Sequence, residues 1–427
     1  MSSLNQSKLK TDLMWNYLSL GIMASSGIAI NIIIASFYGP EALGVFNQVY
    51  AIFVISSQIS TMGLHHSVLK YTAEANDEDV LQNIIASGML LALLLSSLAA
   101  IILFATSPFL GEFFQSENVA KGVEYIAPAL VFFSVNKVLL AFINGREMMK
   151  IYALGNGARF LSIPIFLLIL SSMGVGFEKL TLSFLFAESI VFVLLIGFAV
   201  KPLLIGLSNI MNLDLYKHLS FGSRALFSGI FLEINSRVDI LVLAYFLDDS
   251  SVGIYSFFAL IGEGIYNLFV VIKNNFSPKL VKLYSKSLIS ELNQFVRQAQ
   301  NKIYFISFIV IALIIIILHQ FLFLIPNGEI FQENVTILVI LSSGIWLISG
   351  YIPFESFLTL AGHPELQSLQ SFIIVILNLL LNILLIPYFG VLGAAIATAI
   401  SFISSIVLLN VFIYSYLGIT LRGNLSK

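Results

Sequence analysis

The chain has 427 residues, of which 58% are hydrophobic and 10% are charged, and its formal net charge is −2. A soluble domain carries about 25% charged residues, so this chain has too little polar surface to fold in water alone. The absence of cysteine excludes disulfides and thiolate chemistry, and the near-neutral charge gives no sign of a nucleic-acid partner. The composition therefore predicts an integral membrane protein.

Apolar runs of roughly twenty residues follow one another along the chain, and a helix needs this length to cross a bilayer. Because a lipid-facing backbone must satisfy its own hydrogen bonds, we predict an all-α protein with about twelve transmembrane helices. In chain order they are Leu13–Phe37, Leu43–Leu64, Leu81–Thr106, Val119–Ile143, Ile151–Met173, Leu180–Val200, Leu219–Leu247, Val252–Ile272, Ile303–Ile325, Val335–Leu360, Leu369–Ile386 and Val391–Leu417.

The basic residues between these spans predict the orientation. With the amino terminus inside, the outer loops hold only Lys121 and Lys179. The inner segments hold Lys8, Lys10, Lys70, Arg146, Lys150, Lys201, Lys217, Lys273, Lys279, Lys282, Lys286, Arg297, Lys302, Arg422 and Lys427. Cytoplasmic loops carry the excess of Lys and Arg, so we expect both termini in the cytoplasm.

The longest polar segment, about residues 276–302, would be cytoplasmic. Lys279, Lys282 and Lys286 recur in it at helical spacing, with leucines on the other faces. This pattern is typical of an amphipathic helix on anionic lipid; a partner-binding role is the alternative.

Two pairs of similar segments indicate an internal duplication. The residues around Gly44 resemble those around Gly253, and those around Gly145 resemble those around Gly362, both at a separation of about 210 residues. We therefore predict two pseudo-symmetric six-helix lobes, residues 1–206 and 219–427, joined by a cytoplasmic linker at 207–218. An even number of spans makes them parallel repeats, which in transporters enclose a cleft that opens alternately to each side.

Four segments resemble a known family: Gly39–Phe46, Ser236–Ser256, Ala361–Leu366 and Leu377–Thr398. Together they are similar to the Wzx-type O-antigen flippases of the multidrug/oligosaccharidyl-lipid/polysaccharide exporter (MOP) superfamily. The resemblance spans essentially the whole chain, and its carboxy-terminal block is the most specific part.

The resemblance implies a MATE-like, V-shaped transporter in the bacterial cytoplasmic (inner) membrane. It would move undecaprenyl-pyrophosphate-linked repeat units of O-antigen, as in lipopolysaccharide, or of a similar surface polysaccharide from the cytoplasmic to the outer leaflet. We expect no cofactor, function as a monomer, and transient contact with the polysaccharide polymerase machinery.

Four basic residues fall within predicted spans, where a charge costs about 2.5–3.5 kcal/mol and faces a partner or a wet cavity. Arg159, Arg237, Lys137 and Arg224 would line the cleft and donate to pyrophosphate oxygens. Arg159 is the strongest candidate, because it lies deepest and has no acid nearby in its own helix. The other three have alternatives. Arg237 would pair with Glu233, four residues before it. Lys137 and Arg224 would extend to the membrane interface.

Acidic residues also fall within the spans. Asp239, Glu263, Glu188, Glu233 and Glu355 are candidates to carry a coupling proton or sodium ion. The alternative is that they neutralise the basic residues, and the membrane potential alone could drive a pyrophosphate outward. We predict no catalytic residue and no metal site.

Three functions compete. A lipid-linked oligosaccharide flippase accounts for the intramembrane basic residues, the duplication and the family segments. A multidrug or cation antiporter of the same superfamily would favour an acidic cavity, whereas acids and bases are mixed here. A membrane enzyme such as a polymerase would be expected to have a sizeable outer loop. We therefore predict a flippase, not an enzyme.

Overall fold

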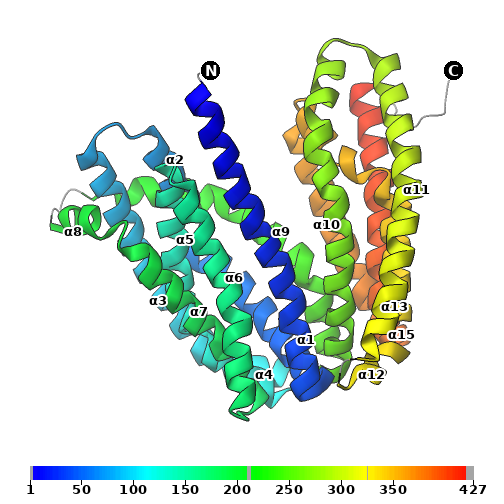
Figure 1. Ribbon diagram of the computed structural model, residues 1–427, viewed down its shortest axis with the longest axis horizontal. Helices are drawn as coiled ribbons and strands as arrows, with labels where there is room; N and C mark the ends of the chain where they lie inside the picture. The colour runs from blue at the N-terminus through cyan, green and yellow to red at the C-terminus, as the bar shows by residue number, and fades with distance from the viewer. Residues whose placement is uncertain (1–2, 209–212, 325, 420–427) are drawn as a thin grey trace. The chain divides into compact units, whose positions relative to one another are not determined.

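A computed structural model describes residues 3–208, 213–324 and 326–419, and within these ranges all regular structure is helical (Figure 1). The helices are α1 (Ser3–Thr61), α2 (Leu64–Glu74), α3 (Glu78–Phe113), α4 (Glu117–Ile126), α5 (Ala129–Gly145), α6 (Met149–Ser172), the 3₁₀ helix η1 (Phe177–Thr181), α7 (Leu182–Ile196), α8 (Val200–Ser208), α9 (Leu215–Phe246), α10 (Asp249–Ser285), α11 (Ile289–Leu322), α12 (Gly328–Glu333), α13 (Thr336–Ser349), the 3₁₀ helix η3 (Ile352–Phe354), α14 (Phe357–Leu360) and α15 (Pro364–Leu417).

The two longest helices are each kinked at a glycine. In α1 the backbone of Gly39 has φ 83°, and in α15 that of Gly390 has φ 55°. Only glycine adopts such angles at little steric cost, and Pro40 and Pro387 near the kinks interrupt the helical hydrogen bonds. Each kinked helix therefore accommodates two of the predicted spans, one on either side of its glycine.

Seven helices of the described chain are long and apolar enough to cross a membrane, or up to nine if each bent pair counts as one span. The bent pairs are α4 with α5, at 45°, and α13 with η3 and α14, at 53°. The kinked helices α1 and α15 each contain two predicted spans, and α9 coincides with one more. Every predicted span therefore coincides with a helix, with one arm of a kinked helix or with a bent pair. Ile325, the end of the ninth predicted span, lies outside the described residues.

The outer surface of α3 shows the expected adaptation to lipid. Leu94, Leu98 and Ile101 are each more than half exposed, whereas Ile85 and Ala92 on the opposite face are fully buried. Such an apolar surface would be unfavourable in water. The bilayer provides the apolar solvent that these side chains need.

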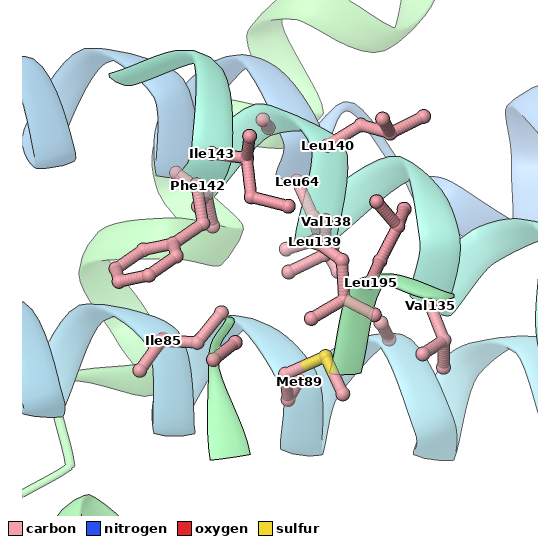
Figure 2. Close-up of a cluster of buried hydrophobic side chains, with 14 of the residues drawn as sticks. Leu64, Ile85, Met89, Val135, Val138, Leu139, Leu140, Phe142, Ile143 and Leu195 are labelled. Carbon is pink, nitrogen blue, oxygen red and sulfur yellow. The ribbon is translucent and has the colours of Figure 1, made fainter. Parts of the chain in front are cut away.

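The helices form two compact units, Met1–Arg237 and Val238–Lys427. Unit 1 has a core of buried aliphatic side chains between α2, α3, α5 and α7 (Figure 2). Leu64, Met89, Val138 and Leu195 meet there, and each is at most 4% exposed. This packing holds the helices that carry the candidate site.

The division between the units falls within α9, beyond the predicted linker at 207–218, of which residues 209–212 are not described. The first turns of α9 belong to unit 1 because they pack closely on the junction between α1 and α2. A Cβ atom on Gly63 or Gly222 would overlap the backbone opposite it, and His218 Nδ1 lies 2.5 Å from Ser67 Oγ.

The predicted amphipathic segment, 276–302, forms the end of α10 and the start of α11. Leu280, Leu283 and Leu292 are buried in unit 2. Its basic residues Lys279, Lys282, Lys286, Arg297 and Lys302 are exposed. Most of the apolar face that we expected to contact lipid therefore packs against protein. The exposed basic side chains are available to anionic lipid or to a partner.

Candidate functional site

Five helices of unit 1 bring charged and aromatic side chains together. α1 contributes Tyr50 and Gln58, α5 contributes Phe133, Asn136 and Lys137, α6 contributes Arg159, α7 contributes Phe184 and Glu188, and α9 contributes Glu233 and Arg237. We call this set the unit 1 charge cluster. It contains three of the four predicted basic residues, and its three cations face two carboxylates.

Arg159 is neutralised by an acid from the neighbouring helix. Its Nη2 donates to Glu188 Oε2 at 3.0 Å, and its Nε lies 2.5 Å from Glu188 Oε1. Asn136 Nδ2 donates to the same carboxylate and to the Glu188 carbonyl oxygen, both at 2.8 Å. The side chains of Arg159 and Glu188 are only 11% and 2% exposed. Arg159 has no acid in its own helix, as the sequence indicated, and its partner comes from α7, in line with the alternative that acids neutralise the basic residues.

Among the described side chains no carboxylate lies at ion-pair distance from Lys137, although Glu233 and Glu188 are near enough to act on its charge. Its Nζ lies 4.9 Å from the centre of the Phe133 ring and 3.5 Å from Gln58 Oε1. The Arg159 guanidinium lies 4.9 Å from the same ring. Phe133 therefore serves two cations, in the geometry that cation–π attraction requires.

Arg237 and Glu233 do not form the pair that their spacing suggested. Glu233 Oε1 instead accepts from Gln58 Nε2 at 3.1 Å. The Arg237 guanidinium lies 5.1 Å from the centre of the Tyr50 ring, and its Nε is buried without a hydrogen-bond partner among the described residues. In the described part of the chain, the contact that stabilises the charge of Arg237 is thus a ring face.

The fourth basic residue, Arg224, is not part of this cluster. It is exposed, its Nε donates to the carbonyl oxygen of Ser220 at 3.0 Å, and its guanidinium lies 6.0 Å from the Phe221 ring centre. This placement fits the alternative in which Arg224 extends to an interface.

Unit 2 contains the other candidate acids. Asp239 Oδ2 accepts from the hydroxyl of Tyr255 at 2.6 Å, and Glu355 accepts from the hydroxyl of Tyr266. Glu355 also lies 3.8 Å from Lys273 Nζ. Glu263, in contrast, is exposed. In the described part of the chain, no group of three or more His, Asp or Glu side chains lies close enough to hold a metal ion.

Sequence reasoning missed the residues that hold the cations. Tyr50, Phe133, Gln58 and Asn136 are uncharged, and neither their spacing nor their type separates them from the many other polar and aromatic residues in the spans. One signal was present: Glu188 is the only acid in its predicted span and Arg159 the only base in the preceding one. Two lone charges in consecutive membrane helices favour pairing across the helices.

The chain matches known proteins over most of its length. The family described as "Polysaccharide biosynthesis protein" matches residues 13–274. A Haloferax volcanii protein described as a "Probable low-salt glycan biosynthesis flippase" is 27% identical over 342 residues, which cover 71% of each chain.

Two solved structures share the fold. The lipid II flippase MurJ in an inward closed conformation superimposes with a TM-score of 0.73 at 15% identity, over 96% of this chain and 89% of its own. An inward-facing multidrug resistance transporter of the MATE family, in the MOP superfamily, gives a TM-score of 0.71 at 14% identity, over 92% of this chain and 93% of its own.

These matches confirm the predicted all-α membrane fold with multiple spans, which the chain shares with MurJ and with the MATE transporter. The family match covers more than half of the chain. The chain therefore belongs to the polysaccharide biosynthesis protein family.

Proposed function

We propose that this protein is a flippase for undecaprenyl-pyrophosphate-linked oligosaccharide repeat units, those of O-antigen or a similar surface polysaccharide. It would move them by alternating access from the cytoplasmic to the outer leaflet of a bacterial inner membrane, with both termini in the cytoplasm. The family match and the glycan flippase relative support this substrate class.

The observation that carries the proposal is the excess of positive charge in the unit 1 charge cluster, where three cations face two carboxylates. Arg159 is paired with Glu188, whereas Arg237, among the described residues, contacts a ring and not an acid. A guanidinium with free donors in a membrane protein suits a phosphate group, to which arginine can bind through two parallel hydrogen bonds. Arg237 is therefore our candidate for the pyrophosphate contact, in place of Arg159.

The acidic residues bear on how transport is driven. Glu188 is committed to Arg159 and Glu233 accepts from Gln58, so neither is readily available to a proton or sodium ion. Asp239 accepts hydrogen bonds from the Tyr255 hydroxyl and the Ile240 N–H, and Glu263 is exposed. If an ion is coupled to transport, these two acids are the remaining candidates; otherwise the membrane potential supplies the drive.

Deleting the gene in its source organism tests the function. We expect loss of the surface polysaccharide and accumulation of lipid-linked repeat units inside the cell. Arg237→Ala should fail to restore the polysaccharide at normal protein levels. The matched control Arg146→Ala, which removes an exposed arginine 3.4 Å from Glu78, should restore it.

Normal polysaccharide in the deletion strain, with no second flippase gene present, would refute the proposal. Drug hypersensitivity with unchanged polysaccharide would instead indicate the antiporter. Full restoration by Arg237→Ala would move the pyrophosphate contact elsewhere in the protein.

A further inference from the structure

Two aromatic rings of unit 1 gather three basic side chains where α2 meets α9. The Nζ atoms of Lys70 and Lys217 lie 5.6 Å and 4.1 Å from the centre of the Tyr71 ring. On the Phe221 ring, Lys70 Nζ lies 5.2 Å and the Arg224 guanidinium 6.0 Å from the centre. The two rings contact each other edge-on at 5.8 Å. We call these five residues the α2–α9 basic surface.

The shared rings bring the three charges within reach of one anion. Because the charges of Lys70 and Lys217 lie at those distances from the same ring centre, they are at most about 10 Å apart. The same argument places Lys70 and Arg224 at most about 11 Å apart. All three side chains are exposed, and lysine has a long, flexible stem. A phosphate group between them can therefore accept hydrogen bonds from Lys70 and from one of the other two.

Packing beneath the surface holds the two helices together. His218 of α9 contacts the Tyr71 ring edge-on at 5.6 Å, and its Nδ1 lies 2.5 Å from Ser67 Oγ of α2. One turn away, a Cβ atom on Gly63 or Gly222 would overlap the backbone opposite it, which shows how closely the helices approach. The α2–α9 basic surface therefore rests on a tightly packed part of unit 1.

Two carboxylates lie at the same surface and oppose its charge in part. Glu74 lies 3.9 Å from Lys70, in a pair whose side chains are both well exposed. Such pairs contribute little to stability and are screened by salt. Asp214 accepts from the backbone N–H of Lys217 at 3.3 Å, at the start of α9. The next acids along the chain, at 77–79, belong to the start of α3. Three basic side chains thus share the surface with two carboxylates.

The surface lies where both helices leave the predicted membrane region. The second predicted span ends at Leu64 and the seventh begins at Leu219, so the two lysines lie just outside the spans. Arg224 lies inside the seventh span and is nevertheless exposed. A charged side chain at this depth extends its head towards the membrane interface, where lipid phosphates are found. This placement favours a lipid headgroup over a soluble partner.

We propose that the α2–α9 basic surface binds the phosphate of an anionic phospholipid headgroup. Lys70, Lys217 and Arg224 would donate to the phosphate, and the Tyr71 and Phe221 rings position the three cations. The inference goes beyond the proposed function, because it concerns a lipid of the surrounding membrane and not the transported molecule.

Native mass spectrometry of the full-length protein in detergent tests the inference, with phosphatidylglycerol and phosphatidylcholine as probes. We expect the wild-type protein to bind phosphatidylglycerol more tightly. Lys217→Gln and Arg224→Gln should each weaken this binding by roughly fivefold, the effect of one basic side chain near an anionic lipid surface. Binding of phosphatidylcholine should change much less. Tyr71→Leu should also weaken phosphatidylglycerol binding, and Tyr71→Phe, which keeps the ring, should retain it.

Lys150→Gln provides the matched control. Lys150 is also an exposed lysine on a ring, 5.4 Å from the centre of Trp15, but no second cation contacts that ring among the described side chains. Its loss removes the same charge without touching the α2–α9 basic surface, so lipid binding should stay as in the wild type. An equal loss in Lys150→Gln would show that net charge alone attracts the lipid and would overturn the inference.

Three other results would also overturn it. The wild-type protein would bind both lipids equally, or Lys217→Gln and Arg224→Gln would both bind as the wild type does. Displacement of the lipid by an equal concentration of inorganic phosphate or polyglutamate would assign the surface to a soluble anion. None of these results bears on the flippase function, which is judged by surface polysaccharide in the deletion strain.

Discussion

The two units support their inner charges in different ways. In unit 1 three cations share a cluster with two carboxylates; Lys137 and Arg237 contact ring faces, and Arg159 contacts a carboxylate. In unit 2 the carboxylates Asp239 and Glu355 each accept a hydrogen bond from a tyrosine hydroxyl of α10. Aromatic residues support both sets, through the face of the ring in unit 1 and through the hydroxyl in unit 2.

This contrast shows that two compact units of one chain can stabilise buried charges by different aromatic contacts. If the chain arose by duplication, as we predict, the two copies have diverged in the contacts around their charged groups. The predictions below test whether each set of charges is held as this comparison states.

The largest expected effect concerns the carboxylate that supports a cation in unit 1. Glu188→Gln removes the charge opposite Arg159, whose side chain is 11% exposed. Breaking a buried pair on one side leaves an uncompensated charge and costs about 3–5 kcal/mol. Reversible unfolding of the purified protein in mixed micelles would measure this loss.

Glu263→Gln is the control, because Glu263 is an exposed acid of a membrane helix and its removal should change the stability little. If Glu188→Gln were as stable as the wild type, Arg159 would have to be hydrated, and the contrast between paired and ring-held cations would fail.

The sequence predicted the helices better than it predicted these partners. Hydropathy locates a span because some twenty neighbouring residues contribute to the same signal. The partner of Arg159 is a single residue on another helix, and nothing local points to Glu188. The spacing of Glu233 and Arg237 did suggest a partner, but Gln58 from α1 competes successfully for Glu233. Contacts between helices decide such pairings, and one sequence does not report them.

The division of the chain shows the same limit. The similar segments around Gly44 and Gly253 predict a second repeat that begins at residue 219, yet the first turns of α9 pack with unit 1. The close approach of Gly63 and Gly222 explains this attachment. Repeat boundaries follow ancestry, whereas compact units follow packing, so the two need not coincide.

The second prediction tests the hydroxyl support in unit 2. Tyr255→Phe keeps the buried ring but removes the donor 2.6 Å from Asp239 Oδ2. A hydrogen bond to a charged group contributes about 1.5–3 kcal/mol, so we expect a loss of stability of this size in the same unfolding assay. Tyr388→Phe, at an 83% exposed residue of unit 2, is the control. No difference between the two variants would indicate that Asp239 is stabilised by other groups.

The smallest expected effect concerns His218, a buried residue of unit 1 whose neutral form is favoured by burial. Burial lowers the pKa of His218 from 6.5 to about 4; Asp214 opposes this shift and Lys217 adds to it. The folded protein therefore binds the proton less readily than the unfolded chain does. Its stability is complete above pH 6.5 and falls as the pH decreases from about 6.5 towards 4.

Between pH 7 and pH 5.5 this histidine should cost the fold about 1 kcal/mol. His218→Gln keeps a polar partner for Ser67 but does not titrate, so its stability should fall less over the same interval. The difference between the two pH profiles isolates His218 from the other four histidines. Parallel profiles would mean that folding leaves the proton affinity of His218 unchanged. Unit 1 would then hold a further cation below pH 6.5.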